Sequence, residues 1–522
     1  MRVLGPRIVD DSGRTLILRG CNLGGGSKIP SVSAAGPTGV SFIGRPFPLE
    51  EAEEHFGNLK RWGMSLVRLV ISWEALEHAG PGIYDEAYLA YLRKLLLEAE
   101  KKGLSVIMDP HQDVWSRWTG GDGAPAWTLE SLGFDLERLD AVGAALTMEH
   151  YAENHGGRAY PAMIWPVNYS LYGAATLFTL FFAGSAYAPD LTIEGENVQD
   201  WLQERYIACF RHCYRRLKNC KAVIGWEAMN EPHPGFIGCR DLNRGENRVV
   251  HLGALPSPWE AMAAASGRPV KVSVYVPWLK PVKTGRALIN PQGLLLFKPG
   301  FSCPWKEAGV WTGEGEDMRL LKKDHFAFYK GRPVRFNDDF LKPFMIRFFE
   351  KMKEAERPAI FFVQGFPQGE PPAWSAEDFS RTGGSLAHGF HCYDGLALFT
   401  KTFSPWFTVD ETAGRLIIGR KNTAAFYSRR LKKAVEWTRE KMENMPCLLG
   451  EFGIPFDLNR KRAYRAGRRE EDYSLQEEAL SLYYDGIDEN LLHSAIWNYT
   501  PGNTHEAGDG WNGEDLSIYY GG

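Results

Sequence analysis

The sequence has little cysteine, no excess of charge of either sign and no apolar leader at its start. Eight cysteines in 522 residues are too few and too irregularly spaced for a disulfide framework, so we expect Cys209, Cys213 and Cys220 to be buried free thiols. Lys and Arg total 60 and Asp and Glu total 64, and a net charge of −4 gives no general attraction to nucleic acid. The first twenty residues lack the h-region of a signal peptide, which predicts a cytoplasmic location.

Cofactor motifs are missing as well. We find no dinucleotide fingerprint, no phosphate loop and no clustered metal ligands, so we predict neither a cofactor nor a metal. One uncharged stretch, residues 169–188, is long enough to span a bilayer. It lies between segments that we expect to share one sheet, so we interpret it as an internal helix that caps the fold, and contact of this helix with lipid stays open.

Eight short apolar runs rich in β-branched residues organise the chain. They occupy residues 17–22, 66–73, 104–113, 222–232, 359–366, 388–394, 447–453 and 494–500. Stretches with helical periodicity lie between several of them, at residues 50–63, 85–103, 424–444 and 474–490. Apolar strands that alternate with helices indicate a parallel sheet buried on both faces, and eight such units predict a closed (β/α)8 TIM barrel.

Long insertions follow the third and fourth strands, at about 114–190 and 234–335. Both leave the same rim of the barrel, so they can build walls around a site there. No linker or low-complexity tract interrupts the sequence, and we therefore expect one catalytic barrel domain over residues 1–522.

Polar side chains stand at the strand ends, where the catalytic face of such a barrel forms. They are Asn22, Arg68, His111 with Asp113, Asn230 with Glu231, His391 with Tyr393, Glu451, and Trp497 with Asn498. Two carboxylates facing each other across a barrel mouth, here Glu231 and Glu451, are what glycoside hydrolysis needs. An isolated glutamate is more often a structural ion-pair partner, but both of these have polar neighbours.

Residue parity adds to this picture. His111 and Asp113 are two residues apart, so both side chains point to the same side of an extended strand. Glu227 shares the parity of Glu231, and we interpret it as a buried, paired core group that takes no part in catalysis.

The motifs resemble glycoside hydrolase family 5, in particular its branch of endoglycoceramidases, fungal glucosylceramidases and steryl-β-glucosidases. The matching segments are RGCNLGGGSKIP (19–30), DPHQDVWSR (109–117), GWEAMNEPHPGF (225–236), HCYD (391–394), LLGEFGIPFDL (448–458), WNYTPGN (497–503) and GDGWNGEDLSIY (508–519). The resemblance covers nearly the whole chain. Relatives usually continue into a C-terminal β-sandwich, which we expect this chain to lack.

The resemblance implies a role for each site residue. Glu231 would be the acid/base and Glu451 the nucleophile, with Arg68 beneath it to keep it ionised. Asn230 would bind the sugar 2-OH, and Tyr393 would donate a hydrogen bond to the nucleophile, with His391 lining the site beside it. Lys28, His111 and Asp113 would contact hydroxyls of the glucose ring. The ring would stack on Trp497.

The implied activity is that of a retaining β-glucosidase for glucosides of large hydrophobic aglycones, glucosylceramide or a steryl glucoside. Its partner would be a glycolipid, with peripheral membrane contact through the basic run at 459–469 as an alternative to a solvated loop. Other functions stay open: an endoglycoceramidase, an open-cleft cellulase or mannanase, and a non-catalytic glycolipid-binding barrel. The aglycone (ceramide, sterol or flavonoid) and the oligomeric state are also undetermined.

Overall fold

A closed barrel of eight parallel strands forms the centre of the computed structural model, which describes residues 1–521 except 34–38, 247, 249, 277–281, 354–358, 368, 411–412 and 466–470. The strands are β4 (Arg19–Leu23), β7 (Leu66–Ser72), β8 (Ser105–His111), β11 (Val223–Glu227), β19 (Ile360–Val363), β20 (Leu386–His391), β23 (Cys447–Glu451) and β24 (His493–Tyr499). Each pairs with its successor along the chain, and β24 closes onto β4. All eight predicted strands and the TIM-barrel fold are thus confirmed.

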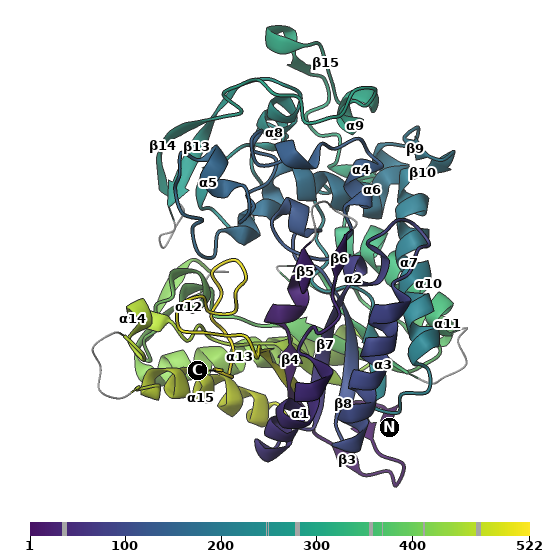
Figure 1. Ribbon diagram of the computed structural model, residues 1–522, viewed down its shortest axis with the longest axis vertical. Helices are drawn as coiled ribbons and strands as arrows, with labels where there is room; N and C mark the ends of the chain where they lie inside the picture. Colours follow the sequence, from purple (N-terminus) through teal and green to yellow (C-terminus); the bar gives the residue numbers. More distant parts are fainter. Residues whose placement is uncertain are drawn as a thin grey trace.

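Helices surround the barrel and cover its apolar outer face (Figure 1). They are α1 (Ala52–Arg61), α2 (Trp73–Glu77), α3 (Glu86–Lys101), α7 (Val198–Leu217), α10 (Lys342–Lys353), α11 (Ala376–Thr382), α13 (Arg420–Lys441) and α15 (Ser474–Glu489). The lower interior of the barrel is filled by aliphatic side chains such as Leu66, Ile107 and Leu448, and Ile8 of the N-terminal sheet packs against them. That sheet comprises β1 (Arg2–Leu4), β2 (Arg7–Val9) and β3 (Thr15–Leu16).

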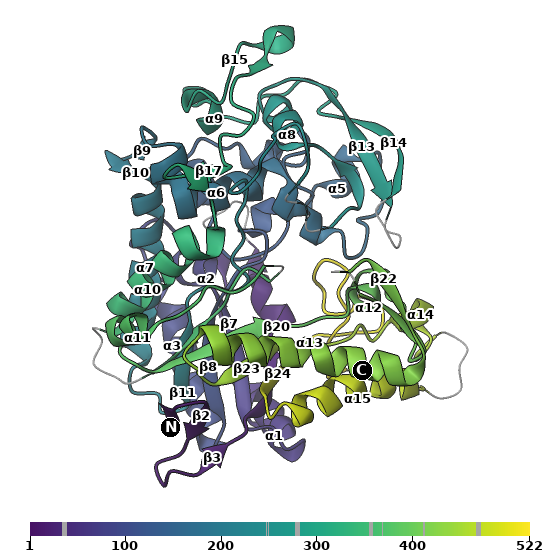
Figure 2. The ribbon, with the colours of Figure 1, turned by 180° about the vertical axis from the view of Figure 1, so that it is seen from behind.

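The two insertions form a cap at the opposite end of the barrel from the N-terminal sheet (Figures 1 and 2). The first contains α4 (Trp127–Glu130), α5 (Tyr151–Asn154), α6 (Tyr172–Tyr187), β9 (Thr192–Ile193) and β10 (Glu196–Asn197). The second contains β12 (Gly253–Leu255), α8 (Pro258–Ala265), β13 (Val270–Val276), β14 (Val282–Ile289), α9 (Pro304–Glu307), β15 (Trp311–Thr312), β16 (Arg319–Leu320), β17 (Phe328–Tyr329) and β18 (Arg332–Pro333).

Shorter elements complete the catalytic side. They are β5 (Val32–Ser33), β6 (Val40–Ser41), α12 (Gly395–Thr400), β21 (Phe407–Asp410), β22 (Arg415–Ile418), α14 (Leu458–Lys461), the 3-10 turns η1 (Gly25–Lys28), η2 (Leu49–Glu51), η3 (Arg117–Thr119), η4 (Leu136–Arg138), η5 (Trp165–Ser170) and η6 (Gly315–Asp317), and the π-helical turn η7 (Asn337–Leu341). The β21–β22 hairpin belongs to the loop after β20, and α14 belongs to the loop after β23.

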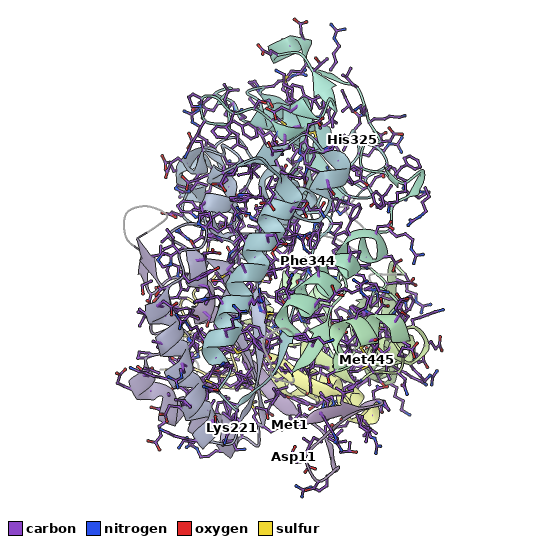
Figure 3. The ribbon with its side chains drawn as sticks, turned by 90° about the vertical axis from the view of Figure 1, so that its right-hand side faces the viewer. Met1, Asp11, Lys221, His325, Phe344 and Met445 are labelled. Carbon is purple, nitrogen blue, oxygen red and sulfur yellow. The ribbon has the colours of Figure 1, made fainter. Side chains whose placement is uncertain are left out.

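The uncharged stretch forms α6, a helix buried in the cap. From Tyr172 to Gly184 every side chain is buried, so this part of the helix touches protein and not lipid. Phe344 of α10, labelled in Figure 3, packs its ring against Phe181 and Phe182 of α6 and thereby joins the cap to the barrel. In the described part of the chain, no helix has both the length and the apolar character needed to cross a bilayer.

Candidate active site

Arg68 organises the floor of the site. Its side chain is fully buried in the barrel, where a lone guanidinium would be very costly. It donates to both oxygens of Glu227, at 3.0 and 2.6 Å, and to Glu451 Oε1 at 2.7 Å. It also donates to the amide oxygens of Asn22 and Asn230, both at 2.9 Å. Burial alone would lower the pKa of Arg68, but the surrounding carboxylates raise it well above its usual value.

Glu451 lies at the end of β23, held from two sides. Arg68 binds its Oε1, and the Tyr393 hydroxyl donates to its Oε2 at 2.9 Å. Its side chain is only 7% exposed. Glu451 therefore has a cation on one carboxylate oxygen and a hydroxyl donor on the other, an arrangement that holds its side chain in one orientation.

Glu231 stands opposite on the loop after β11. Its Oε1 lies 2.8 Å from His391 Nδ1, and the same nitrogen is 3.5 Å from Glu451 Oε2. One oxygen of each glutamate and a ring nitrogen of His391 all lie within 4.8 Å of one another. Inverting hydrolases separate their two carboxyls by about 6.5–9.5 Å, whereas retaining enzymes hold them about 5–5.5 Å apart. An approach of two carboxyl oxygens to within 4.8 Å is compatible with the shorter separation of the retaining class.

Gln364, at the end of β19, links Glu227 to the backbone of Glu231. Its side-chain nitrogen donates to Glu227 at 3.0 Å, and its oxygen accepts from the backbone N–H of Glu231 at 3.2 Å. Glu227 is therefore buried and paired, as residue parity predicted. Gln364 was not predicted as a site residue, although it is a polar side chain at the end of the predicted strand 359–366, the same signal that identified the others.

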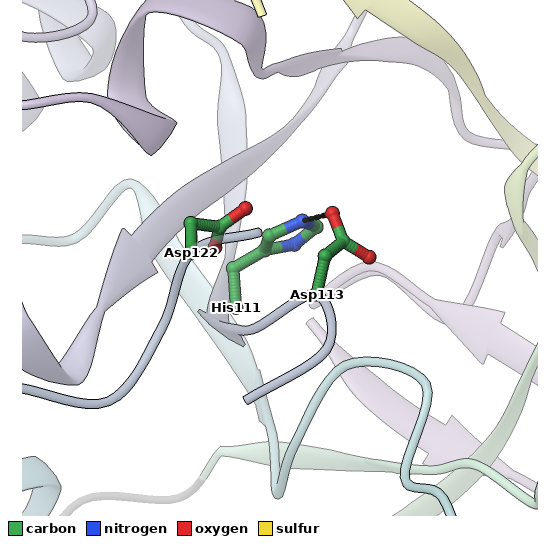
Figure 4. Close-up of side chains that lie close together, drawn as sticks. All are labelled: His111, Asp113 and Asp122. Carbon is green, nitrogen blue, oxygen red and sulfur yellow. Dashed lines mark hydrogen bonds and ion pairs between the residues drawn. The ribbon is translucent and has the colours of Figure 1, made fainter. Parts of the chain in front are cut away.

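A second group of charged side chains lies across the barrel, which we call the Lys28 cluster: Lys28, His111, Asp113, Asp122 and Glu514. All five are at most 5% exposed. The Lys28 ammonium lies 2.5 Å from Asp113 Oδ2 and 3.9 Å from Asp122 Oδ2. His111 Nε2 is 3.4 Å from Asp113, the contact drawn in Figure 4. His111 Nδ1 is held by Asp109 at 2.7 Å, a residue of the same strand parity that was not predicted.

Indole rings line this cluster. Trp497 stacks on the ring of His111, with 5.4 Å between centroids and 10° between planes. The Lys28 ammonium lies 4.4 Å from the ring centroid of Trp497 and 3.7 Å from that of Trp511. Trp497 donates from its indole nitrogen to Glu514 at 3.4 Å. Flat apolar rings beside polar side chains suit the two kinds of surface that a sugar ring presents.

Glycines bring Asp122 to this position. The chain after β8 turns back so that Asp113 and Asp122 exchange backbone hydrogen bonds at 3.2 and 3.1 Å. A Cβ at Gly121 would lie 1.9 Å from the Asp113 carbonyl oxygen, and Gly123 has φ +121°, so neither position tolerates a larger residue. The turn therefore requires the glycines of the GGDG sequence at 120–123. Asp122, the acid of this sequence, was not predicted as a site residue, because its spacing from other polar residues follows no pattern.

Charges within the Lys28 cluster are unevenly satisfied. Burial would raise the pKa of Asp113, but Lys28 and His111 outweigh it and hold that pKa well below its usual value. Burial raises the pKa of Asp122 to about 8 and that of Glu514 to about 7. Among the described residues, neither carboxylate oxygen of Asp122 has a hydrogen-bond partner.

His111, Asp113 and Asp122 include atom types that ligate metals, and one such atom from each lies within 4.8 Å of the others. The ammonium of Lys28 already occupies the flank of Asp113, so a metal cation would meet a positive charge there. We therefore retain the prediction that the site binds no metal.

The structure brings together all ten side chains predicted for the site. Glu231, Glu451, Arg68, Asn230, His391 and Tyr393 form one group, and Lys28, His111, Asp113 and Trp497 lie in the other. A pair of facing carboxylates at the C-terminal rim of a (β/α)8 barrel, one buried and one partly exposed, with a polar, indole-lined cluster beside it, defines a glycoside hydrolase.

Comparisons with known proteins agree. A family model described as "Cellulase (glycosyl hydrolase family 5)" matches residues 27–132. A glucosylceramidase of Rhizopus delemar is 36% identical, over 98% of this chain and 77% of that protein. An ergosteryl-beta-glucosidase of Saccharomyces cerevisiae is 31% identical, over 98% of this chain and 74% of that protein. The crystal structure of Cryptococcus neoformans sterylglucosidase 1 with tris matches with a TM-score of 0.92 at 34% sequence identity. The match covers 99% of this chain and 79% of that chain. The chain belongs to glycoside hydrolase family 5.

Proposed function

We propose that the enzyme is a retaining β-glucosidase that removes glucose from lipid glucosides such as glucosylceramide or a steryl glucoside. The observation that carries this proposal is the approach of one oxygen of Glu231 and one of Glu451 to within 4.8 Å, over a floor in which Arg68 donates to Glu451. The similarity to glucosylceramidases and a steryl glucosidase supports the lipid aglycone.

The two glutamates would divide the chemistry between them. Glu451 attacks the anomeric carbon and forms a covalent glucosyl ester, while Glu231 protonates the leaving oxygen. Glu231 then takes a proton from water, which attacks the ester and releases glucose. Tyr393 and Arg68 hold the attacking carboxylate, and His391, within reach of both glutamates, positions Glu231.

The remaining predicted residues would bind the sugar. Asn230, fixed by Arg68, faces the 2-OH, where hydrogen bonds strengthen in the transition state. Lys28, His111 and Asp113 contact other hydroxyls, and Trp497 stacks on the ring.

Removal of a single glucose is supported by the Lys28 cluster. Asp122 and Glu514 are 1% and 5% exposed, so a second sugar attached on this side would meet buried polar side chains instead of solvent. The unpartnered oxygens of Asp122 offer acceptors for hydroxyls of a terminal glucose. An endoglycoceramidase would need this side to be open.

Product analysis on glucosylceramide, lactosylceramide and a steryl glucoside, run side by side, tests the proposal. We expect free glucose from the two monoglucosides and no reaction of lactosylceramide. Intact lactose from lactosylceramide would make the enzyme an endoglycoceramidase, with the catalytic roles retained. Hydrolysis of glucan chains without activity on aryl or lipid glucosides would indicate a cellulase or mannanase, and failure on every β-glucoside would indicate a binding protein.

Peripheral contact with anionic membrane is the second part of the proposal. In the basic run at 459–469, the side chains of Arg460, Arg462 and Arg465 are exposed, whereas Arg468 and Arg469 lie outside the described residues. Basic residues near an anionic surface contribute about 1 kcal/mol each. Co-sedimentation with anionic liposomes that does not change between low and high salt would exclude electrostatic docking.

A further inference from the structure

The β21–β22 hairpin presents apolar side chains to solvent. Its register pairs Phe407 with Ile418 and Val409 with Leu416, so these four side chains point to one face of the ribbon. Phe407 is 40% exposed, Leu416 45% and Ile418 66%. Trp406, the residue before β21, is 61% exposed. We call Trp406, Phe407, Leu416 and Ile418 the apolar face.

The opposite face of the hairpin is fastened to the barrel. Thr408 is buried and donates to Asp394 Oδ2 at 2.8 Å, and Ile417 packs against the main core. Asp394 directly follows Tyr393, the residue that holds Glu451. The α12 helix begins next to Asp394, and its Leu398 packs with Tyr393 and Trp497. The hairpin therefore has a fixed position beside the active site.

Exposed cations flank the apolar face. They are Arg415, Arg420, Lys421, Arg460, Arg462 and Arg465. The segment that carries the last three is joined to the chain leading into β21, because the Asn459 backbone N–H donates to the Lys401 carbonyl at 2.8 Å. Two carboxylates neutralise part of this positive charge, because Asp410 forms an ion pair with Arg415 and Glu478 forms one with Arg420.

We propose that the apolar face docks into the interface of an anionic lipid bilayer and holds the active site at the membrane surface. A tryptophan beside aliphatic side chains suits the boundary between headgroups and acyl chains, and the flanking cations suit anionic headgroups. This inference rests on the proposed function, because a glucoside of ceramide or sterol stays in the bilayer and must be reached there. Figure 2 shows β22 on the same side of the molecule as the β13–β14 hairpin of the cap.

Vesicle binding by the full chain tests the inference. Vesicles of phosphatidylcholine alone and of phosphatidylcholine with phosphatidylserine are titrated with wild type, Ile418→Asn and the control Leu491→Asn. Leu491 is 73% exposed, but it lies between α15 and β24 at the other end of the barrel. We expect wild type to bind the mixed vesicles, Ile418→Asn to bind them about tenfold more weakly, and Leu491→Asn to bind like wild type. Equal binding by all three, or none by wild type, would overturn the proposal.

Insertion of the tryptophan is measured separately. Brominated lipids should quench part of the tryptophan fluorescence of wild type, and Trp406→Phe should keep vesicle binding while losing that part of the quenching. Unchanged quenching in Trp406→Phe would contradict insertion of this face. A wild type that is dimeric in solution, does not bind vesicles and becomes monomeric on Ile418→Asn would show that the face contacts a second copy instead.

Activity on a soluble aryl β-glucoside separates this inference from the proposed function. Ile418→Asn should retain wild-type kcat/KM on that substrate and lose activity on glucosylceramide in vesicles. If wild type hydrolyses no β-glucoside at all, the proposed function fails, whatever the vesicles show. If wild type is active but Ile418→Asn hydrolyses the vesicle substrate normally, only the docking surface is refuted.

Discussion

The two halves of the active site differ in how completely the protein satisfies its own charges. Around Glu451 both carboxylate oxygens have donors, from Arg68 and Tyr393. In the Lys28 cluster, Asp122 has none within the described chain, although it is just as deeply buried. A buried polar atom without a partner is costly unless a ligand supplies one. The difference supports the proposal that the first half holds the attacking carboxylate and that the second half receives hydroxyl groups of the substrate.

The largest expected effect comes from removing the proposed nucleophile. Glu451→Gly should lower kcat on an aryl β-glucoside by about 10⁴-fold or more, because no other group forms the glucosyl ester. Azide should restore turnover and yield the α-glucosyl azide, since it fills the space of the lost carboxylate. Normal turnover without azide would remove Glu451 from this role.

Arg68→Met should destabilise the whole first half. It leaves Glu227 and Asp109 as buried carboxylates without their main cation, which costs about 3–5 kcal/mol of unfolding free energy. Arg68→Lys keeps the charge but cannot bridge several carboxylates at once, so we expect a smaller loss. Denaturant unfolding measures both variants. Similar losses in the two would mean that the forked geometry of the guanidinium, and not its charge alone, matters at this position.

Asp122→Ala should act on binding in the second half. We expect KM for a β-glucoside to rise about tenfold with kcat changed less, as for the loss of one or two hydrogen bonds to substrate. Asp122→Asn keeps an oxygen in place and should raise KM less. Asp11→Asn, at the exposed N-terminal turn, serves as the control and should leave KM unchanged.

Deoxy substrates sharpen the same comparison. Wild type should discriminate against a 4-deoxy or a 6-deoxy glucoside, and Asp122→Ala should discriminate less against whichever lacks the hydroxyl that faces Asp122. Unchanged discrimination against both analogues would place Asp122 outside the sugar site.

The last expected effect is on stability as a function of pH. Because burial raises the pKa of Asp122 to about 8, the folded protein keeps a proton that the unfolded chain releases near pH 4. The contribution of Asp122 to stability should therefore fall as pH rises from about 4 to 8, and stay level above pH 8. Thermal unfolding of wild type relative to Asp122→Asn between pH 5 and pH 9 measures this trend. A difference that does not change with pH would contradict the raised pKa.

Much of this molecule could be predicted from its sequence. Each barrel strand is a local apolar run, and each ends in the polar group that the structure places at the rim. Boundaries were less well predicted. The first insertion, expected to end at about residue 190, extends to Asn197, because a β9–β10 turn through Glu194 and Gly195, both with positive φ, precedes α7 and Asn197 then caps that helix.

The sequence by itself determined the barrel, the carboxylate pair and its neighbours, because strand periodicity and short motifs are local properties of the chain. Tertiary structure decided which distant residues complete the site and which side chains stay exposed. Glu514 interacts with Lys28, which lies near the other end of the sequence. Asp122 is placed in the site by a turn between glycines, and its position follows no strand or helix periodicity. The apolar face exists only because the hairpin register aligns Phe407 with Ile418 while Thr408 faces inward. The contact of Glu514 with Lys28 depends on closure of loops over long sequence separations, which no local pattern encodes.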